Sequence, residues 1–273
     1  MNVSKFWRPE RRNRRIGTKS SGYSQSNDMR IPSSWCDKTG KLTLFHELLE
    51  RPYEMEAIIY GCDITILYET PKEGFSYGCS PADVIKLLKL VAIDVPPLPD
   101  IIVFRQPTRK QRQQNPVWGR FFYYSEFGKH KGSAIVLEAQ KIGDSLIWPR
   151  RMSLEDRDEY NRLNDDGHRF VETKRDFRAE LTEDAIRSTL LFRTFLHELG
   201  HWADYSYKVI FGNSAIDGEY DNDTAEDLYF ARPTSEREVY AHAFADKYRK
   251  RLKNAGEIPF APEPFELPER MQE

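Results

Sequence analysis

Residues 191–202 constrain the fold of this chain more than any other segment, because they place two imidazoles on one face of an apolar helix. His197 and His201 are four residues apart, and on a helix this spacing directs both side chains to the same side. The neighbouring residues are largely apolar, which predicts a buried helix, and unpaired imidazoles are costly to bury. The sequence therefore predicts that the two rings share a partner.

The order His-Glu-x-x-His indicates a metal as that partner. Two neutral imidazoles can occupy two corners of a tetrahedral zinc site, and Glu198 follows the first of them, where a carboxylate can deprotonate a water. Gly200 lowers helix propensity by roughly 1 kcal/mol relative to Ala, which indicates a close approach by another element. The alternative is a core or surface helix that carries two histidines by chance.

A catalytic zinc site needs a third protein ligand, and Glu238 is the best-placed donor downstream. A helix through this region puts Glu238, Ala241 and Ala245 on one stripe, and the small residues would let it lie close to the first helix. Two alternatives stay open. Ser235 and Glu238 have the spacing of a capping box, in which Glu238 only caps the backbone, and Glu236 is a second carboxylate within reach.

Two motifs carry a resemblance to a known family, and they read His197-Glu198-Leu199-Gly200-His201 and Glu238-x-x-Ala241-x-x-Phe244-Ala245. Together they resemble the gluzincin type of zinc metallopeptidase, with the nearest likeness to the ImmA/IrrE-like regulatory metallopeptidases. The resemblance covers about 50 of the 273 residues. It implies His197, His201 and Glu238 as zinc ligands and Glu198 as the catalytic acid and base.

The same resemblance implies an α+β, zincin-like fold. A small mixed sheet would pack on the helix that carries the first motif, and a C-terminal helix would carry the third ligand. An edge strand of that sheet would receive an extended substrate, and we expect residues 133–139 to provide it.

One residue departs from the family pattern: His242 stands where Asn or Asp is usual after the Ala. His242 could be a fourth ligand that closes the site and makes the zinc structural, a donor that stabilises the transition state, or a polar helix residue. Tyr240 is a second candidate for the donor role.

Composition limits the compartment and the class of protein. The three cysteines, Cys36, Cys62 and Cys79, are odd in number and lack CxxC spacing, which favours reduced thiols. No apolar run approaches the length of a membrane span, and the N-terminus lacks the apolar core of a secretory signal. We therefore expect a cytoplasmic protein without a membrane partner.

The sequence divides into three parts. Residues 1–30 are basic and rich in Ser and Asn, which predicts a disordered arm that contacts nucleic acid or an acidic protein, or else a solvated tail without a partner. We expect residues 31–257 to form one domain, zincin-like as the resemblance implies, with a charged insertion at about 150–181, and residues 258–273 to form a Pro-rich tail. Neither end can bury a core, so we expect both to be dispensable for folding.

The local patterns predict the following elements along the domain. Helices are expected at residues 42–49, from Ser80 to 91, at 154–163, at 182–205 and from Ser235 to just before Gly256; strands at 58–68, 101–104, 118–124 and 133–139, the last two as a hairpin; and loops at 105–115 and 212–233.

The function expected from these features is a zinc-dependent endopeptidase, which hydrolyses a protein or peptide with a metal-activated water and with Glu198 as the general base. Two rival hypotheses differ in the role of the zinc and of the basic arm. In one, the zinc only stabilises a module that binds nucleic acid or a protein through its arm. In the other, the chain is a DNA-associated metallopeptidase, in which the arm recruits the enzyme.

Overall fold

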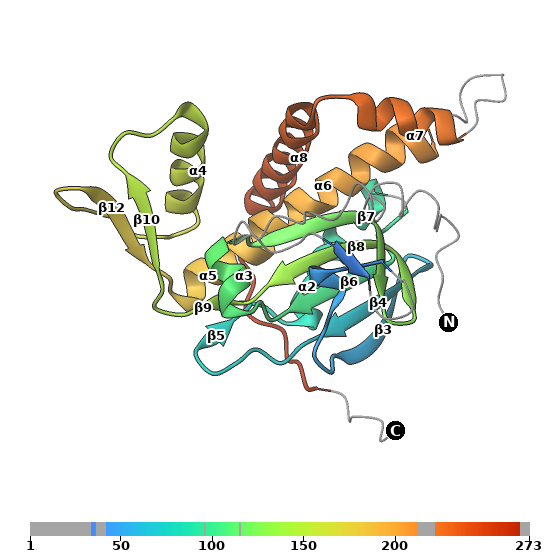
Figure 1. Ribbon diagram of the computed structural model, residues 1–273, viewed down its shortest axis with the longest axis horizontal. Coiled ribbons are helices and arrows are strands. Elements are labelled where there is room, and N and C mark those ends of the chain that lie inside the picture. The colour runs from blue at the N-terminus through green and yellow to red at the C-terminus, as the bar shows by residue number, and fades with distance from the viewer. Residues whose placement is uncertain (1–33, 37–41, 96, 115, 212–221, 268–273) are drawn as a thin grey trace.

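The computed structural model describes residues 34–36, 42–95, 97–114, 116–211 and 222–267. The predicted basic arm of residues 1–30 lies outside this range. The described chain is a mixed α+β structure, in which a mixed sheet is covered by helices and a smaller unit projects from one side (Figure 1). Its class agrees with the predicted α+β fold.

The central sheet has five strands in the order β3-β4-β6-β8-β7. Its inner strands are parallel to one another, and an antiparallel hairpin partner lies at each edge. The strands are β3 (Tyr53–Ile59), β4 (Cys62–Tyr68), β6 (Ile101–Arg105), β8 (His130–Glu138) and β7 (Gly119–Phe127). Two short pairs lie outside this sheet: β1 (Ser34–Cys36) with β2 (Leu42–Leu44), and β5 (Phe75–Ser76) with β9 (Gln140–Lys141).

Residues 58–68 do not form the single strand that their composition predicts. Tyr60 and Gly61 both have positive φ angles, 50° and 79°, and they turn the chain between β3 and β4. Two consecutive positive φ angles are typical of the two-residue turn of a β-hairpin.

The hairpin predicted from residues 118–124 and 133–139 is present as β7 and β8. The expected substrate edge is wrong, however, because β8 pairs with β6 on one side and with β7 on the other. The open edge on this side of the sheet is β7, which pairs only with β8 among the described strands.

The helix of the first motif is longer than predicted. It consists of α5 (Glu183–Thr189), the π-helical turn η3 (Leu190–Thr194), α6 (Phe195–Tyr205) and a second π-helical turn, η4 (Ser206–Ile210). Thr182 caps its start, as expected, by accepting a hydrogen bond from the backbone of Ala185. The last helix, α8 (Thr234–Asn254), crosses α6 on the same side of the sheet (Figure 1).

The main core lies between the sheet and these helices. Side chains of β4, β6 and β8, including Ile66, Ile102 and Ile135, pack with Leu196 and Leu199 of α6. Helix α2 (Pro81–Val91) joins the same core, and Ser80 caps it through the predicted capping box with Asp83. A short helix η2 (Ala92–Asp94) follows it.

Three further segments differ from the prediction. Residues 42–49 form β2 and the single turn η1 (Phe45–Glu47) in place of a helix, and the 105–115 loop contains α3 (Arg109–Gln114). Within the predicted loop of residues 212–233, α7 (Asn222–Ala231) is helical, and its Tyr229 packs in the main core. Residues 212–221 lie outside the described range.

The charged insertion is an ordered unit. It contains β10 (Ser145–Pro149), α4 (Leu154–Asp165), β11 (Val171–Glu172) and β12 (Asp176–Glu180), with the strands in the order β10-β12-β11. Helix α4 matches the helix predicted at 154–163. Charged residues of the insertion bind the motif helix: Arg193 donates hydrogen bonds to Asp166 at 2.6 Å and to Glu159 of α4 at 3.0 Å.

The C-terminal segment also packs on the domain, although we expected it to lie outside. Ile258 is 4% exposed, and the Phe260 ring contacts the Phe192 ring with centroids 5.2 Å apart. The backbone of Glu263 donates a hydrogen bond to Asp83 at 2.9 Å. The domain therefore extends beyond residue 257. None of the described helices combines the length and the apolar composition that crossing a bilayer requires.

Candidate metal centre

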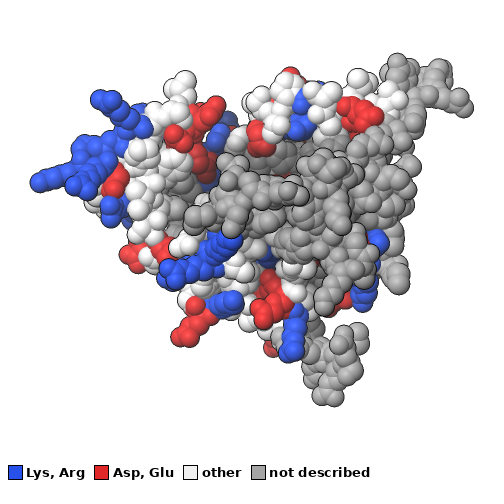
Figure 2. Space-filling model, in the orientation of Figure 1, with Lys and Arg blue, Asp and Glu red and all other residues white. Residues whose placement is uncertain are grey.

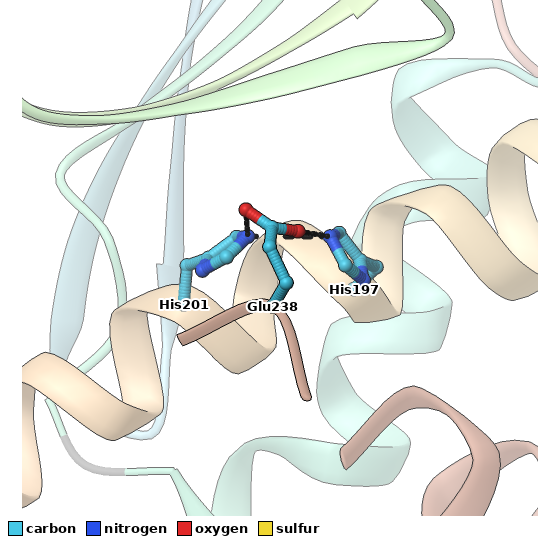
Figure 3. A group of neighbouring side chains, drawn as sticks. All are labelled: His197, His201 and Glu238. Atoms are coloured by element: carbon cyan, nitrogen blue, oxygen red, sulfur yellow. Dashed lines mark hydrogen bonds and ion pairs between the residues drawn. The ribbon is translucent and has the colours of Figure 1, made fainter. Parts of the chain in front are cut away.

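Three side chains from two helices converge at the crossing of α6 and α8 (Figure 3). The Nε2 atoms of His197 and His201 are 3.2 Å apart. Glu238 directs one carboxylate oxygen to each ring, with Oε2 3.3 Å from the His197 Nε2 and Oε1 3.6 Å from the His201 Nε2. The structure thus brings together the three residues that the sequence singled out.

Small residues allow this convergence. A Cβ placed on Gly200 would lie 3.0 Å from the Cα of Ala241 and 3.1 Å from its carbonyl oxygen. Ala241 is fully buried and Ala245 is 2% exposed, so the two helices meet through glycine and alanine at their crossing. The close approach predicted from Gly200 is therefore present, and it places the N-terminal turn of α8 beside the two imidazoles.

The donor set and its charges fit a divalent cation. Hydrogen bonding to His197 and to His201 holds the pKa of Glu238 well below its usual range, so this group is a carboxylate. Burial by itself would lower the pKa of His201, but the hydrogen bond to Glu238 raises it above the usual value. Two imidazole nitrogens and a carboxylate oxygen that face a common point are a ligand set that Zn²⁺ favours.

Glu198 is close to this group but does not belong to it. Its side chain is 7% exposed, and burial raises the pKa of its carboxyl group. The strand β7 packs directly against it, since a Cβ on Gly119 would lie 3.4 Å from the Cγ of Glu198 and 2.7 Å from the Cγ2 of Thr194. Glu198 therefore lies between the donor group and the open edge of the sheet.

The alternatives for the third donor are placed elsewhere. Glu236 forms an ion pair with Arg232 at 2.8 Å on the exposed side of α8. The capping box does not form, because α8 begins at Thr234 after Pro233, with Ser235 inside its first turn and no side-chain cap. Glu238 is thus the carboxylate of this helix that contacts the motif histidines.

His242 lies one turn after Glu238 and flanks the group without joining it. Its ring centroid is 4.4 Å from that of His197, but its nitrogens are not among the donor atoms that converge. Burial lowers the pKa of His242 to about 4, so the ring is neutral at pH 7. Tyr240 faces another way, with its ring against the ammonium group of Lys208 at 5.1 Å.

Two neighbours of the centre were missed in the sequence, and both lie on β7. Gly119 allows the strand to approach Glu198, and a glycine inside a strand pattern is a known signal of close backbone contact. Arg120 follows it and forms an ion pair with Glu138 at 3.4 Å; burial raises the pKa of Glu198, and the charge of Arg120 offsets part of that rise. No local pattern indicated that Arg120 lies near the motif helix.

The π-helical turn η3 directly precedes the motif. Such turns are often found at functional sites, because the extra residue in the turn changes the direction of the side chains that follow. Arg193 within this turn is held by Asp166 and Glu159, so the insertion contacts the helix just before His197.

Comparisons of the chain with protein-family models, with curated proteins and with solved structures yield no match.

Proposed function

We propose that this chain is a zinc-dependent endopeptidase with a zincin-like arrangement of sheet and motif helix. The observation that carries the proposal is the convergence of His197, His201 and Glu238, with the buried Glu198 beside them. The three donors would hold one zinc ion and leave a fourth position for water or substrate. When bound, zinc lowers the pKa of a coordinated water and polarises a carbonyl group.

Glu198 has the position and environment of a general base. It follows the first ligand on α6, and it is not needed as a donor, so its carboxylate is free to take a proton from the attacking water. Its burial raises the pKa, which also suits the second half of the reaction, in which the proton passes to the leaving amine.

The substrate would bind along β7 as an added strand. This strand is one of the two edges of the five-stranded sheet and pairs only with β8 among the described strands, and Gly119 brings it against Glu198. A pocket of about 600 Å³ lies beside Val117, two residues before Gly119, and Arg112, Gln140 and Leu146 contribute to its lining. The pocket does not include the metal donors, and its position near the start of β7 suits a side chain of an extended peptide.

The substitution Glu198→Gln tests this proposal. It keeps the size of the side chain and removes the base, so we expect about one zinc per chain, an unchanged fold and a loss of hydrolysis by a factor of ~10²–10⁴. Cleavage of a random peptide mixture, read by mass spectrometry, and metal analysis by mass spectrometry are the measurements. Glu236→Gln is the matched control, because the same change at an exposed carboxylate should leave both values at wild-type level. Wild-type cleavage by Glu198→Gln would contradict the proposal.

A structural zinc site is the second candidate, and the proximity of His242 to His197 favours it. If His242 turned to become a fourth ligand, the site would be closed to water. His242→Ala separates the two candidates. The endopeptidase proposal predicts that zinc stays bound, because His242 lies outside the converging donors. Loss of the zinc, together with no cleavage by the wild-type chain, would instead establish a structural site.

A further inference from the structure

The insertion ends in a cluster of cations that the proposed function does not use. Arg150 and Arg151 follow the outer end of β10, and Lys174 and Arg175 lie in the turn between β11 and β12. We call these four residues the basic tip. All four are exposed, and Arg150 donates a hydrogen bond to the carbonyl of Lys174 at 3.3 Å, which joins the two segments. Figure 2 shows blue side chains gathered on the insertion, at the left of the view.

The basic tip carries more positive charge than its own acids neutralise. Glu172 is paired with Arg150, and Asp176 is paired with Arg178 at 2.8 Å. Arg151, Lys174 and Arg175 form no side-chain hydrogen bond or ion pair with any residue of the described chain. Three cations are therefore available to an anionic partner.

The shape of the surface favours duplex DNA over other polyanions. The tip is the end of a small antiparallel sheet that projects from the body of the molecule (Figure 1). A β-ribbon fits the major groove of B-form DNA, whereas the major groove of double-stranded RNA is too deep and narrow for side chains to read. Arginine forks also match the geometry of phosphate oxygens.

The insertion exposes the aliphatic side chains of Ile147, Leu154 and Val171, but it lacks the exposed aromatic rings of an interfacial membrane anchor. The large aromatic residues of the insertion face inward, where Phe177 contacts the Tyr160 ring of α4 with centroids 5.3 Å apart. Trp148 pairs with Phe177 across β10 and β12 and is half-buried. An interfacial anchor would instead present such rings beside the cations.

The insertion is firmly attached to the metal centre. Asp166 follows α4, and its side chain is fully buried. It forms ion pairs with Arg193 at 2.6 Å and with Arg249 at 2.5 Å. Arg193 belongs to the turn before His197, and Arg249 belongs to α8. A partner that binds the tip would therefore be held at a set distance from the centre.

We propose that the basic tip is a docking surface for duplex DNA, with its strands at the major groove and its cations against the flanking phosphates. The proposal concerns binding alone and does not depend on the proposed peptidase activity. It is also distinct from the binding expected of the basic arm, since the tip and the arm are different parts of the chain.

The test compares two triple variants of the full chain. Arg151→Gln, Lys174→Gln and Arg175→Gln together remove the available charge of the tip. The control variant replaces Lys247, Lys250 and Lys253, three exposed lysines on α8, with Gln. Binding to a fluorescein-labelled duplex of arbitrary sequence, about two helical turns long, is followed by anisotropy between about 50 and 200 mM KCl.

We expect the tip variant to bind the duplex at least about tenfold more weakly. The slope of log K against log[KCl] should also become smaller in magnitude by about 2.7, because three phosphate contacts are lost. The control should stay within about twofold of the wild type. Lys174→Arg keeps the charge and should retain wild-type binding. Circular dichroism melts should coincide, because every replaced side chain is exposed.

Three results would overturn the proposal. The tip variant could bind the duplex as tightly as the wild type, which would leave the binding to other parts of the chain. Both triple variants could weaken equally, which would indicate an effect of net charge alone. Finally, the tip variant could lose binding to phosphatidylserine vesicles or to poly-glutamate while it keeps binding to the duplex, which would assign the surface to a membrane or to an acidic protein.

Discussion

At the scale of single residues, two glutamates on α8 show how strongly position determines chemistry. Glu236 and Glu238 differ by two residues, so they point to different sides of the helix. Glu236 pairs with the exposed Arg232, whereas Glu238 reaches both motif histidines. Only one of these acids therefore has the geometry of a metal ligand.

This difference leads to a prediction for zinc affinity. Glu238→Gln removes an anionic oxygen from the donor group, so we expect a loss of zinc affinity of about tenfold or more and a parallel loss of cleavage. Glu236→Gln serves as the control and should bind zinc as the wild type does. Competition with a fluorescent zinc chelator measures both values. Equal affinities in the two variants would remove Glu238 from the ligand set.

The sequence predicted those residues of the centre that belong to a repeating local pattern. His197, Glu198 and His201 follow from helical spacing, and Glu238 follows from the small residues that line its face of the helix. Gly119 and Arg120 could not be predicted in the same way. Their approach to Glu198 depends on how a strand packs against a helix, and that contact joins segments about 80 residues apart in the sequence.

At the scale of elements, the crossing of α6 and α8 controls the position of Glu238. The contact at Gly200 is with the backbone of Ala241, which cannot rotate away as a side chain would. A substitution at Gly200 must therefore shift one helix relative to the other.

Gly200→Ala tests this control. Alanine is a better helix former by roughly 1 kcal/mol, but its methyl group would overpack the crossing, which typically costs 1–3 kcal/mol. We expect lower zinc affinity and no net gain in stability, because the shift moves Glu238 away from the histidines. Thermal melts with and without zinc, together with chelator competition, provide the measurements. Ala243→Ser is the control, since Ala243 is exposed on the same α8 helix. A variant with higher stability and unchanged zinc binding would show that the crossing is less tight than described.

The element predictions failed where pairing between distant segments decides the outcome. The hairpin β7–β8 was predicted from its two strands and its turn, but local sequence does not determine which of the two strands lies at the edge. The sequence of residues 58–68 predicts one strand, because Tyr60 is a typical strand residue. In the structure, the turn at Tyr60 and Gly61 divides this segment into the end of β3 and the whole of β4. The helix α7 was missed because acidic residues dominate its first turns.

At the scale of the whole molecule, the charged insertion and the C-terminal segment both pack on the rest of the domain. The charged insertion binds the motif helix and α8 through Asp166. The C-terminal segment packs beside α2 and α5, where Arg187 donates a hydrogen bond to the carbonyl of Phe260 at 3.3 Å. Composition could not indicate either contact, because charge and proline content describe the average of a segment and not its few buried side chains.

The C-terminal segment is part of the folded domain and not a dispensable tail. Its Pro-rich sequence suggested that it is dispensable, but Ile258 is 4% exposed and belongs to the main core, whereas Leu267 is 42% exposed. Ile258→Ala should therefore lower the free energy of unfolding by roughly 2–5 kcal/mol, the usual cost of removing a buried isoleucine side chain. Leu267→Ala provides a matched control and should change it by less than about 0.5 kcal/mol. Urea unfolding followed by tryptophan fluorescence measures both, and equal stabilities would return residues 258–267 to the role of a dispensable tail.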